Sequence, residues 1–350
     1  MEAKPKSSLP ENNRPRLAVV GTSHWHHKFY REIIAQDSKV VAFSDPSPAK
    51  IKEVEPFYGN IGRLDWRELL DEQLKLDGVI VLAPHDEMKN VCLAFIERRI
   101  PIFIEKPGGM NAAEVGAIRE AAERLKVPIA VPFIQRLGNL WKFLQKVGTL
   151  DYATFLFQSG PPERYINQSP WALERVHAGG GCFINLAVHY IDLFLAATHA
   201  KTVTVQAQAQ YRLSQPYDVE DRLTALMTTE EGASAVIECG YAFPGTPPGG
   251  GSNPLGRYLA YSARGSEGFI TIDGNGNIAL TPKVGDRTAV NGNVDSGPLS
   301  KIFIRDAIAG IPAGFAGLPG IGDLHRTMQV VDAAYDSVYN KRSVTATIAW

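Results

Sequence analysis

The sequence contains few cysteines and has no excess of charge of either sign. Its three cysteines, Cys92, Cys182 and Cys239, are isolated and lack a C-x-x-C spacing. We therefore expect buried, reduced thiols rather than a disulfide framework or a zinc knuckle. Lys and Arg number 36 against 37 Asp and Glu, giving a formal net charge of -1. The basic excess typical of nucleic-acid-binding proteins is missing.

The sequence also shows no run long enough to read as a membrane span, which needs roughly 20 apolar residues. Residues 1–14 are polar and have no apolar core of the kind found in secretory signals. We therefore expect a cytoplasmic protein without a membrane or nucleic-acid partner. The 350 residues, 45% hydrophobic and 21% charged, are ordinary for a globular protein of about two domains.

The first third of the chain alternates short apolar runs with helical patterns. Strands are predicted at 16–20, 39–43, 78–83, 101–104 and 128–133, and helices at 24–35, 66–74, 87–99 and 112–126. This alternation predicts a doubly wound parallel sheet with crossover helices on both faces. We expect an α/β Rossmann domain over residues 15–134, preceded by a polar tail at 1–14.

The pattern changes after residue 134. Longer, alternating strands are predicted at 202–213, 222–229, 233–242, 257–263 and 268–273, after a helix at 182–198. They predict an α+β substrate and oligomerisation domain over 135–350 with a large, mostly antiparallel open sheet. Its outer face is either solvated or the contact of a homodimer or homotetramer. The Gly- and Pro-rich stretch 241–256 predicts a long loop, and a final helix at 322–340 is expected to pack back toward the cleft.

A candidate dinucleotide site lies where the first strand runs into Gly21 and then a helix. Backbone N–H groups and the helix dipole favour a pyrophosphate there. The G-x-G-x-x-G pattern is incomplete, with Gly21, Ser23 and His26 at its three positions. Asp45 follows the second strand, where a carboxylate binds ribose hydroxyls and repels a 2′-phosphate, which favours NAD over NADP. Alternatively, Asp45 only opens a turn before Pro46.

The run His24-Trp25-His26-His27 has two interpretations. Three histidines so close together suggest a metal site, but the sequence places no carboxylate or cysteine beside them. At a helix start beside a phosphate they more simply donate hydrogen bonds. We therefore predict that His24, Trp25 and His26 contact the cofactor and that no metal is bound.

Two further motifs carry a family resemblance. Glu105-Lys106-Pro107-Gly108-Gly109 follows the fourth strand, and Gly179-Gly180-Gly181 precedes Asn185, His189 and Asp192. With these motifs the chain resembles the Gfo/Idh/MocA oxidoreductase family from about Arg16 to Ile348. Arg136 and the segment Ala333-Ala334-Tyr335-Asp336-Ser337 also resemble the family.

The resemblance implies a reaction and its residues. Lys106 would lie beside the nicotinamide and hydrogen-bond the reacting hydroxyl, and Pro107 would follow a cis bond. Glu105 would orient the lysine or bind the nicotinamide ribose. His189 would remove the hydroxyl proton, a task suited to a group whose pKa lies near the working pH. The three glycines would let the chain pass close to the cofactor.

Other positions depart from the family or are less specific. Asn185 stands where an aspartate is usual; four residues before His189, it shares that helix face as a catalytic or substrate-orienting group. Asp192 is placed to hold the imidazole. The family's Pro-Asn-x-x-His reads Pro84-His85-Asp86-Glu87-Met88 and loses its histidine, but Pro84 remains a predicted cofactor contact. The predicted substrate contacts are Arg136, Trp171, Arg175, Asn185, His189 and His325.

Three functions follow from these predictions. The first is reversible NAD-linked oxidation of a secondary hydroxyl on a sugar, a cyclitol or a derivative, with Lys106 and His189 handling the proton. The second is a glycosidase or lyase that retains NAD and oxidises its substrate only transiently. The third is a non-catalytic regulator that senses the dinucleotide.

Overall fold

The computed structural model describes residues 10–243, 257–273, 276–292 and 296–350. The chain forms two compact units. Unit 1 comprises the chain up to Gly109, Glu114–Pro132 and Ser300–Ile321. Unit 2 comprises Met110–Ala113, Phe133–Leu299 and Gly322–Trp350. The chain passes from unit 1 to unit 2 after Pro132, close to the predicted boundary at 134. Two segments depart from that division: Met110–Ala113 belongs to unit 2, and Ser300–Ile321 belongs to unit 1.

Unit 1 is built on a six-stranded parallel sheet in the order β3-β2-β1-β4-β5-β6. Its strands are β1 Arg16–Val20, β2 Lys39–Ser44, β3 Gly62–Arg63, β4 Gly78–Val81, β5 Ile102–Ile104 and β6 Ile129–Ala130. Every residue of β4 and β5 is buried, as expected for strands covered on both faces. The predicted Rossmann fold is confirmed, and the strand order reverses between β1 and β4, where such folds bind ligands.

Four crossover helices connect these strands: α1 His27–Asp37, α2 Pro48–Tyr58, α3 His85–Glu97 and α4 Ala112–Leu125. Because parallel crossovers are right-handed, α1 and α2 cover one face of the sheet, and α3 and α4 cover the other. The predicted helix at 66–74 is wrong. That segment forms two 3₁₀ turns, Trp66–Leu70 and Glu72–Leu74, because Asp71 accepts the Gln73 N–H and starts a second turn. The strand predicted at 128–133 shortens to β6.

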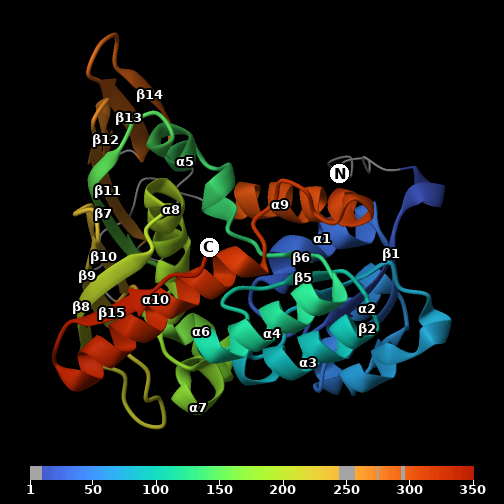
Figure 1. Ribbon diagram of the computed structural model, residues 1–350. Coiled ribbons are helices and arrows are strands. Elements are labelled where there is room, and N and C mark those ends of the chain that lie inside the picture. The colour runs from blue at the N-terminus through green and yellow to red at the C-terminus, as the bar shows by residue number, and fades with distance from the viewer. Residues whose placement is uncertain (1–9, 244–256, 274–275, 293–295) are drawn as a thin grey trace. The chain divides into compact units, whose positions relative to one another are not determined.

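Helix α9, Ser296–Gly310, was not predicted, and from Ser300 onward it belongs to unit 1. Its residues Ile304, Ala307 and Ile308 face Leu17 of β1 and Phe103 of β5 across a small apolar gap. An ion pair of 3.1 Å from Arg305 Nε to Asp37 Oδ2 joins it to the end of α1. Figure 1 shows α9 beside α1. The chain thus returns to cover the half of the sheet that α1 and α2 leave open.

Unit 2 is built on a nine-stranded sheet in the order β14-β13-β12-β11-β7-β10-β9-β8-β15. Its strands are β7 Leu150–Gln158, β8 Thr202–Gln210, β9 Arg222–Thr229, β10 Ser234–Gly240, β11 Tyr258–Gly265, β12 Gly268–Ile272, β13 Asn277–Pro282, β14 Thr288–Asn291 and β15 Val344–Thr347. Strands β7 and β10 pair in parallel, and the other described pairs are antiparallel. The predicted open sheet is confirmed. Its central strand β7 was not predicted.

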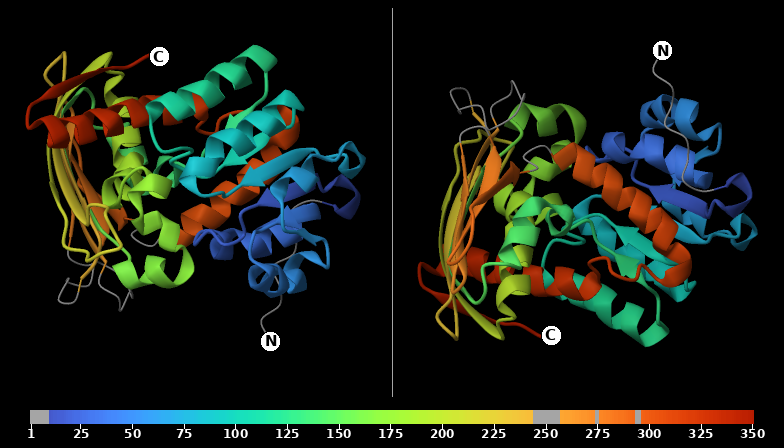
Figure 2. Two further views of the ribbon diagram at one scale, coloured as in Figure 1. Left: turned by 90° about the horizontal axis from the view of Figure 1, so that it is seen from below. Right: turned by 90° about the horizontal axis from the view of Figure 1, so that it is seen from above.

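The helices of unit 2 lie on one side of this sheet, as Figure 2 shows. They are α5 Asn139–Leu144, α6 Pro162–Gln168, α7 Arg175–Ala178, α8 Val188–Thr198 and α10 Ile321–Asn340. Helix α10 confirms the predicted terminal helix, whose packing toward a cleft stays a prediction. The predicted helix at 182–198 begins instead with a π-helical segment, Phe183–Ala187, followed by α8. Of the predicted loop at 241–256, residues 244–256 lie outside the described part of the chain.

The segment Arg175–Thr198 is long and apolar enough to pass a compositional test for a membrane span, but 89% of its apolar window is buried. It therefore has the burial of a core helix. Cys92, Cys182 and Cys239 are buried and unpaired, as predicted.

Candidate functional site

The loop after β1 is shaped by Gly21. Its φ of 83° lies in the region that favours glycine. A Cβ at this position would lie 2.5 Å from the Leu82 carbonyl oxygen, just beyond β4. The loop therefore passes directly over the end of the neighbouring strand, which explains the first glycine of the incomplete motif.

Asp45 holds this loop from the end of β2. Its buried carboxylate accepts hydrogen bonds from Thr22 Oγ1 (3.1 Å), Ser23 N (2.6 Å) and Ser23 Oγ (2.8 Å). It also accepts the Ser47 N–H at 3.0 Å, so the turn that we considered as the alternative is present. Binding a ribose hydroxyl would require that hydroxyl to take the place of one of these donors. Such a ribose contact stays a prediction.

A pocket of about 330 Å³ opens beside Asp45 at the carboxyl ends of β1, β2 and β4. Its lining includes Gly21, Asp45, Trp66, Arg67 and Pro84. The aromatic and carboxylate groups at the point where the strand order reverses fit the adenosine end of a dinucleotide. The Arg67 guanidinium carbon lies 4.8 Å from the centre of the Trp66 ring. This pair was not predicted, because both residues were assigned to a helix.

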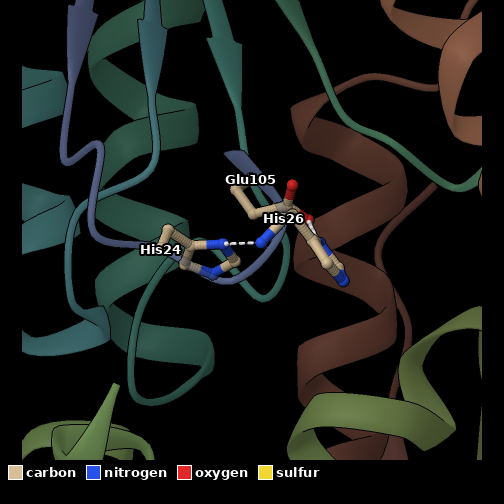
Figure 3. A group of neighbouring side chains, drawn as sticks. All are labelled: His24, His26 and Glu105. Atoms are coloured by element: carbon tan, nitrogen blue, oxygen red, sulfur yellow. Dashed lines mark hydrogen bonds and ion pairs between the residues drawn. The ribbon is translucent and has the colours of Figure 1, made fainter. Parts of the chain in front are cut away.

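The histidine run separates into two groups. His27 Nε2 lies 2.9 Å from the Tyr58 hydroxyl of α2, and both side chains are buried. His24 and His26 instead lie beside Glu105, as Figure 3 shows. His26 Nδ1 is 3.2 Å from Glu105 Oε1. The predicted cofactor contacts His24, His26 and Glu105 are therefore neighbours within unit 1.

The hydrogen bonds of this cluster define the state of His24. Its Nδ1 accepts the His26 N–H at 3.1 Å, which assigns the hydrogen of the neutral ring to Nε2. Burial lowers the pKa of His24 well below its usual value, and the charges of His26 and Lys106 contribute in the same direction. His24 is therefore neutral at pH 7.

One ligand atom from each of His24, His26 and Glu105 lies within 4.8 Å of the others, a spacing that suits a metal ion. The tautomer argues against it, since His24 Nδ1 is occupied by the His26 N–H and Nε2 carries the hydrogen. Binding a cation through His24 would break the bond that shapes the loop. We keep the prediction that the run binds no metal.

Lys106 follows β5 and is 2% exposed, and its bond to Pro107 is cis, as the resemblance implied. Its neighbour Glu105 is fully buried and accepts hydrogen bonds from Tyr30 Oη (2.9 Å) and from the Lys106 N–H (3.2 Å). Glu105 thus fixes the backbone that carries the lysine. No motif indicated Tyr30, because nothing in the sequence tells which face of α1 meets β5.

In unit 2, Asn185 lies in the π-helical segment and His189 follows it in the first turn of α8. Asn185 is buried, and its Nδ2 donates to the Tyr165 hydroxyl at 3.1 Å. The Tyr165 ring lies 5.1 Å from that of Tyr241, two aromatic residues that the sequence analysis did not select. The His189 ring is partly exposed and makes an edge contact with Phe133 at 6.2 Å between ring centres.

Asp192, which we had placed beside His189, forms a bidentate ion pair with Arg136. Both Arg136–Asp192 hydrogen bonds measure 2.7 Å. Asp323 adds a second carboxylate at 3.3 Å, and the Arg136 guanidinium carbon lies 5.1 Å from the Trp141 ring centre. Arg136, a predicted substrate contact, is thus already engaged by two carboxylates.

The three glycines are explained by contacts inside unit 2. A Cβ on Gly179 would lie 2.5 Å from the Met110 carbonyl oxygen. A Cβ on Gly180 would lie 2.1 Å from Tyr335 Oη, and one on Gly181 would lie 2.1 Å from the Glu220 carbonyl oxygen. These distances leave no room for a side chain at any of the three positions. Packing within the protein is therefore enough to explain why all three are glycines. The predicted close approach to the cofactor stays a prediction.

The remaining predicted substrate residues also lie in unit 2. Trp171 is in the 3₁₀ turn Pro170–Leu173, and Arg175 begins α7. The Arg175 N–H donates to Asp218 Oδ1 at 2.7 Å, which leaves its exposed side chain out of that bond. His325 is partly exposed in the second turn of α10.

A doubly wound sheet with a nucleotide-sized pocket at its switch point and a buried lysine after β5 is typical of the NAD-binding oxidoreductase class. Comparison with family models agrees. Residues 15–133 match the NAD-binding Rossmann fold of the oxidoreductase family, and residues 145–271 match the GFO/IDH/MocA C-terminal domain. The chain belongs to the Gfo/Idh/MocA oxidoreductase family, and NAD is its cofactor.

Curated and solved proteins resemble the chain over nearly its whole length. The inositol 2-dehydrogenase of Rhizobium meliloti (strain 1021) is 22% identical over 336 residues, which cover 88% of this chain and 92% of that protein. An inositol dehydrogenase homolog from Azotobacter vinelandii, solved with NAD+, has a TM-score of 0.77 at 16% identity and covers 99% of this chain and 100% of its own. Levoglucosan dehydrogenase, solved with NADH and levoglucosan, has a TM-score of 0.80 at 16% identity, covering 96% of this chain and 100% of its own.

Proposed function

We propose that this protein uses NAD to oxidise, reversibly, a secondary hydroxyl of a sugar, a cyclitol or a close derivative. The observation that carries the proposal is the burial of Lys106, 2% exposed at the carboxyl end of β5 beside the histidine cluster. Burying an amino group costs free energy, and a buried lysine at the carboxyl end of a strand in this fold is placed to meet a bound ligand. The names of the relatives, inositol and levoglucosan dehydrogenases, support this substrate class.

In the proposed reaction, four side chains bind the substrate hydroxyl, hold it in place or accept its proton. Bound NAD supplies the hydride acceptor. Lys106 donates a hydrogen bond to the reacting oxygen, and Glu105 holds the lysine's backbone in place. His189 takes the hydroxyl proton, because an imidazole can accept and return a proton near neutral pH. Asn185, whose amide already donates to Tyr165, presents its carbonyl oxygen to orient a substrate hydroxyl.

The cofactor contacts that we propose are those predicted from the sequence: Gly21, Ser23, His24, Trp25, His26, Asp45, Pro84, Glu105 and Lys106. For the substrate we retain Trp171, Arg175 and His325 as the first contacts to test, because the guanidinium of Arg136 is paired with Asp192 and Asp323. We expect the reaction to take place in the cytoplasm and to need neither a membrane nor a nucleic acid.

The test is the formation of NADH from NAD with a panel of sugars, cyclitols and their acidic and keto derivatives. Once a substrate is found, Lys106→Ala and His189→Ala should each lower kcat by about 100-fold or more, the scale of a lost proton-transfer group. Lys39→Ala, at an exposed lysine of unit 1, is the matched control and should retain activity. Full activity in either site variant would remove the mechanism.

Two further measurements on the same purified protein distinguish the two alternative functions. Release of an aglycone without net NADH, from protein purified with NAD bound, would identify the NAD-retaining elimination. Binding of NAD with no turnover of any compound in the panel, and a protein partner whose affinity follows the NAD/NADH ratio, would identify the regulator.

We further propose that the open sheet face joins two copies of the chain in a homodimer or homotetramer. Leu226 of β9 and Val236 of β10 are paired across the two strands, and they are 45% and 37% exposed. Exposed aliphatic residues at the middle of a sheet face are typical of a surface that a partner covers.

A further inference from the structure

The helical segment that carries Asn185 and His189 begins with four N–H groups that need partners. A helix start leaves its first four backbone donors without acceptors inside the helix. Here the four donors are the N–H groups of Gly181, Cys182, Phe183 and Ile184. Two residues far away in the sequence, Glu220 and Tyr335, accept all four.

Glu220 accepts three of these hydrogen bonds. Its Oε2 accepts the Gly181 N–H at 2.8 Å, its Oε1 accepts the Phe183 N–H at 2.9 Å, and its carbonyl oxygen accepts the Cys182 N–H at 3.1 Å. A carboxylate with one oxygen on each of two nearby amides fixes both the position and the rotation of the turn. Its negative charge also lies at the positive end of the helix dipole.

Tyr335 completes the arrangement from α10. Its Oη accepts the Ile184 N–H at 3.2 Å and donates to Glu220 Oε1 at 2.9 Å. Gly180 and Gly181 leave the space that these two residues fill, since a Cβ on either glycine would lie 2.1 Å from an atom of Tyr335 or Glu220. We call Glu220 and Tyr335 together the Glu220–Tyr335 brace.

The brace lies at the start of the π-helical turn Phe183–Ala187. A π-turn is less regular than an α-helix, so packing and end contacts must keep it in one register. Asn185 lies within this turn and His189 one turn further on. A shift in the first turn is therefore transmitted to the direction of both side chains.

We propose that Glu220 is a positioning residue for Asn185 and His189, and that it acts through the helix start together with Tyr335. This inference rests on the proposed function, in which those two side chains meet the substrate. Displacements of about 1 Å in a reacting group can cost about 100-fold in rate, so a modest loosening of this turn is enough to be measured.

The test compares Glu220→Gln with a matched control, Glu230→Gln. The Glu230 carboxylate likewise accepts two backbone N–H groups, from Lys201 (2.7 Å) and Thr202 (2.9 Å), and the Thr202 hydroxyl at 3.2 Å. It does so on the surface, in the turn that follows β9. The control removes the same chemistry beyond the C-terminal end of α8, away from the helix start that carries Asn185 and His189.

We expect Glu220→Gln to lower kcat by about tenfold or more while the Kd for NAD stays within about twofold, because unit 1 is untouched. Amide hydrogen exchange should accelerate in peptides covering residues 181–189 and remain unchanged in β4 and β5. Glu230→Gln should leave kcat and these exchange rates unchanged. Unchanged kcat in Glu220→Gln, with or without faster exchange, would overturn the positioning role.

If Glu220→Gln does not fold, Tyr335→Phe takes its place. It removes the acceptor of the Ile184 N–H and one donor to Glu220, but it keeps the two carboxylate–amide bonds, so a smaller loss of kcat with the same pattern is expected. A wild-type protein that oxidises no compound would contradict the proposed function instead. In that case, faster amide exchange of residues 181–189 in Glu220→Gln than in the wild type still shows whether Glu220 fixes the start of this helical segment.

Discussion

The stability of unit 1 should fall in mild acid because of one buried histidine. His27 begins α1, is 3% exposed and lies 2.9 Å from the Tyr58 hydroxyl. Burial, together with the charges of Arg31 and Lys50, lowers the pKa of His27 from 6.5 to about 3. The ring is therefore neutral in the folded protein at any pH in ordinary use.

The sign and the size of the effect follow from this difference. Below pH 6.5 the unfolded chain binds a proton at residue 27 that the folded chain does not bind until about pH 3. Stability is thus complete above pH 6.5 and is lost as the pH falls toward 3, at up to about 1.4 kcal/mol per pH unit. Between pH 7.5 and pH 5.0, His27 alone accounts for a loss of about 2 kcal/mol.

The assay is a urea titration at both pH values, read by pulsed amide exchange in β1 and β4 so that it reports on unit 1. His27→Gln keeps a hydrogen-bonding group for Tyr58 but does not titrate. The wild type should lose about 2 kcal/mol more than this variant between pH 7.5 and 5.0. His199→Gln, at an exposed histidine of unit 2, is the control. Equal losses in the wild type and His27→Gln would refute the reasoning.

Three more predictions concern unit 2. Gly181→Ala should lower the denaturation midpoint and kcat together, because the added Cβ meets the Glu220 carbonyl oxygen; thermal unfolding and kinetics on one preparation check this. Asp192→Asn should destabilise the fold by about 2 kcal/mol, since an amide can accept only one of the two Arg136 hydrogen bonds that the carboxylate accepts, and a urea titration in which Asp192→Asn matches the wild type would contradict it. Leu226→Asp should convert the proposed dimer to a monomer in sedimentation, with the secondary structure unchanged by circular dichroism; an unchanged sedimentation coefficient would remove the open sheet face as the interface.

Much of the architecture could be predicted because it depends on local patterns. Uniformly apolar runs such as 79–82 identified strands buried on both faces, and alternating runs identified the open sheet. The two motifs around Lys106 and His189 identified the family. The central strand β7 was missed although its sequence LDYATFLFQ alternates between buried and more exposed residues and is bounded by Gly148 and by Ser159-Gly160-Pro161.

What failed depended on long-range contacts. Asp192 was assigned to His189 because the two share a helix, whereas the arginine that pairs with it lies 56 residues earlier in the chain. The sequence did not show that Gly180 and Gly181 are also required by Tyr335 and Glu220, because no spacing rule connects these residues. The histidine run suggested one cluster. Successive residues at a helix start point in different directions, however, and His27 lies beside Tyr58.

The return of α9 has a consequence for how the nucleotide-binding half can be made. A gene fragment that stops near residue 134 would leave Leu17, Val79 and Phe103 facing water where α9 covers them in the full chain. During synthesis on the ribosome, α9 cannot cover the parallel sheet until residue 310 has emerged. This half of the protein cannot be exchanged between genes as one uninterrupted cassette.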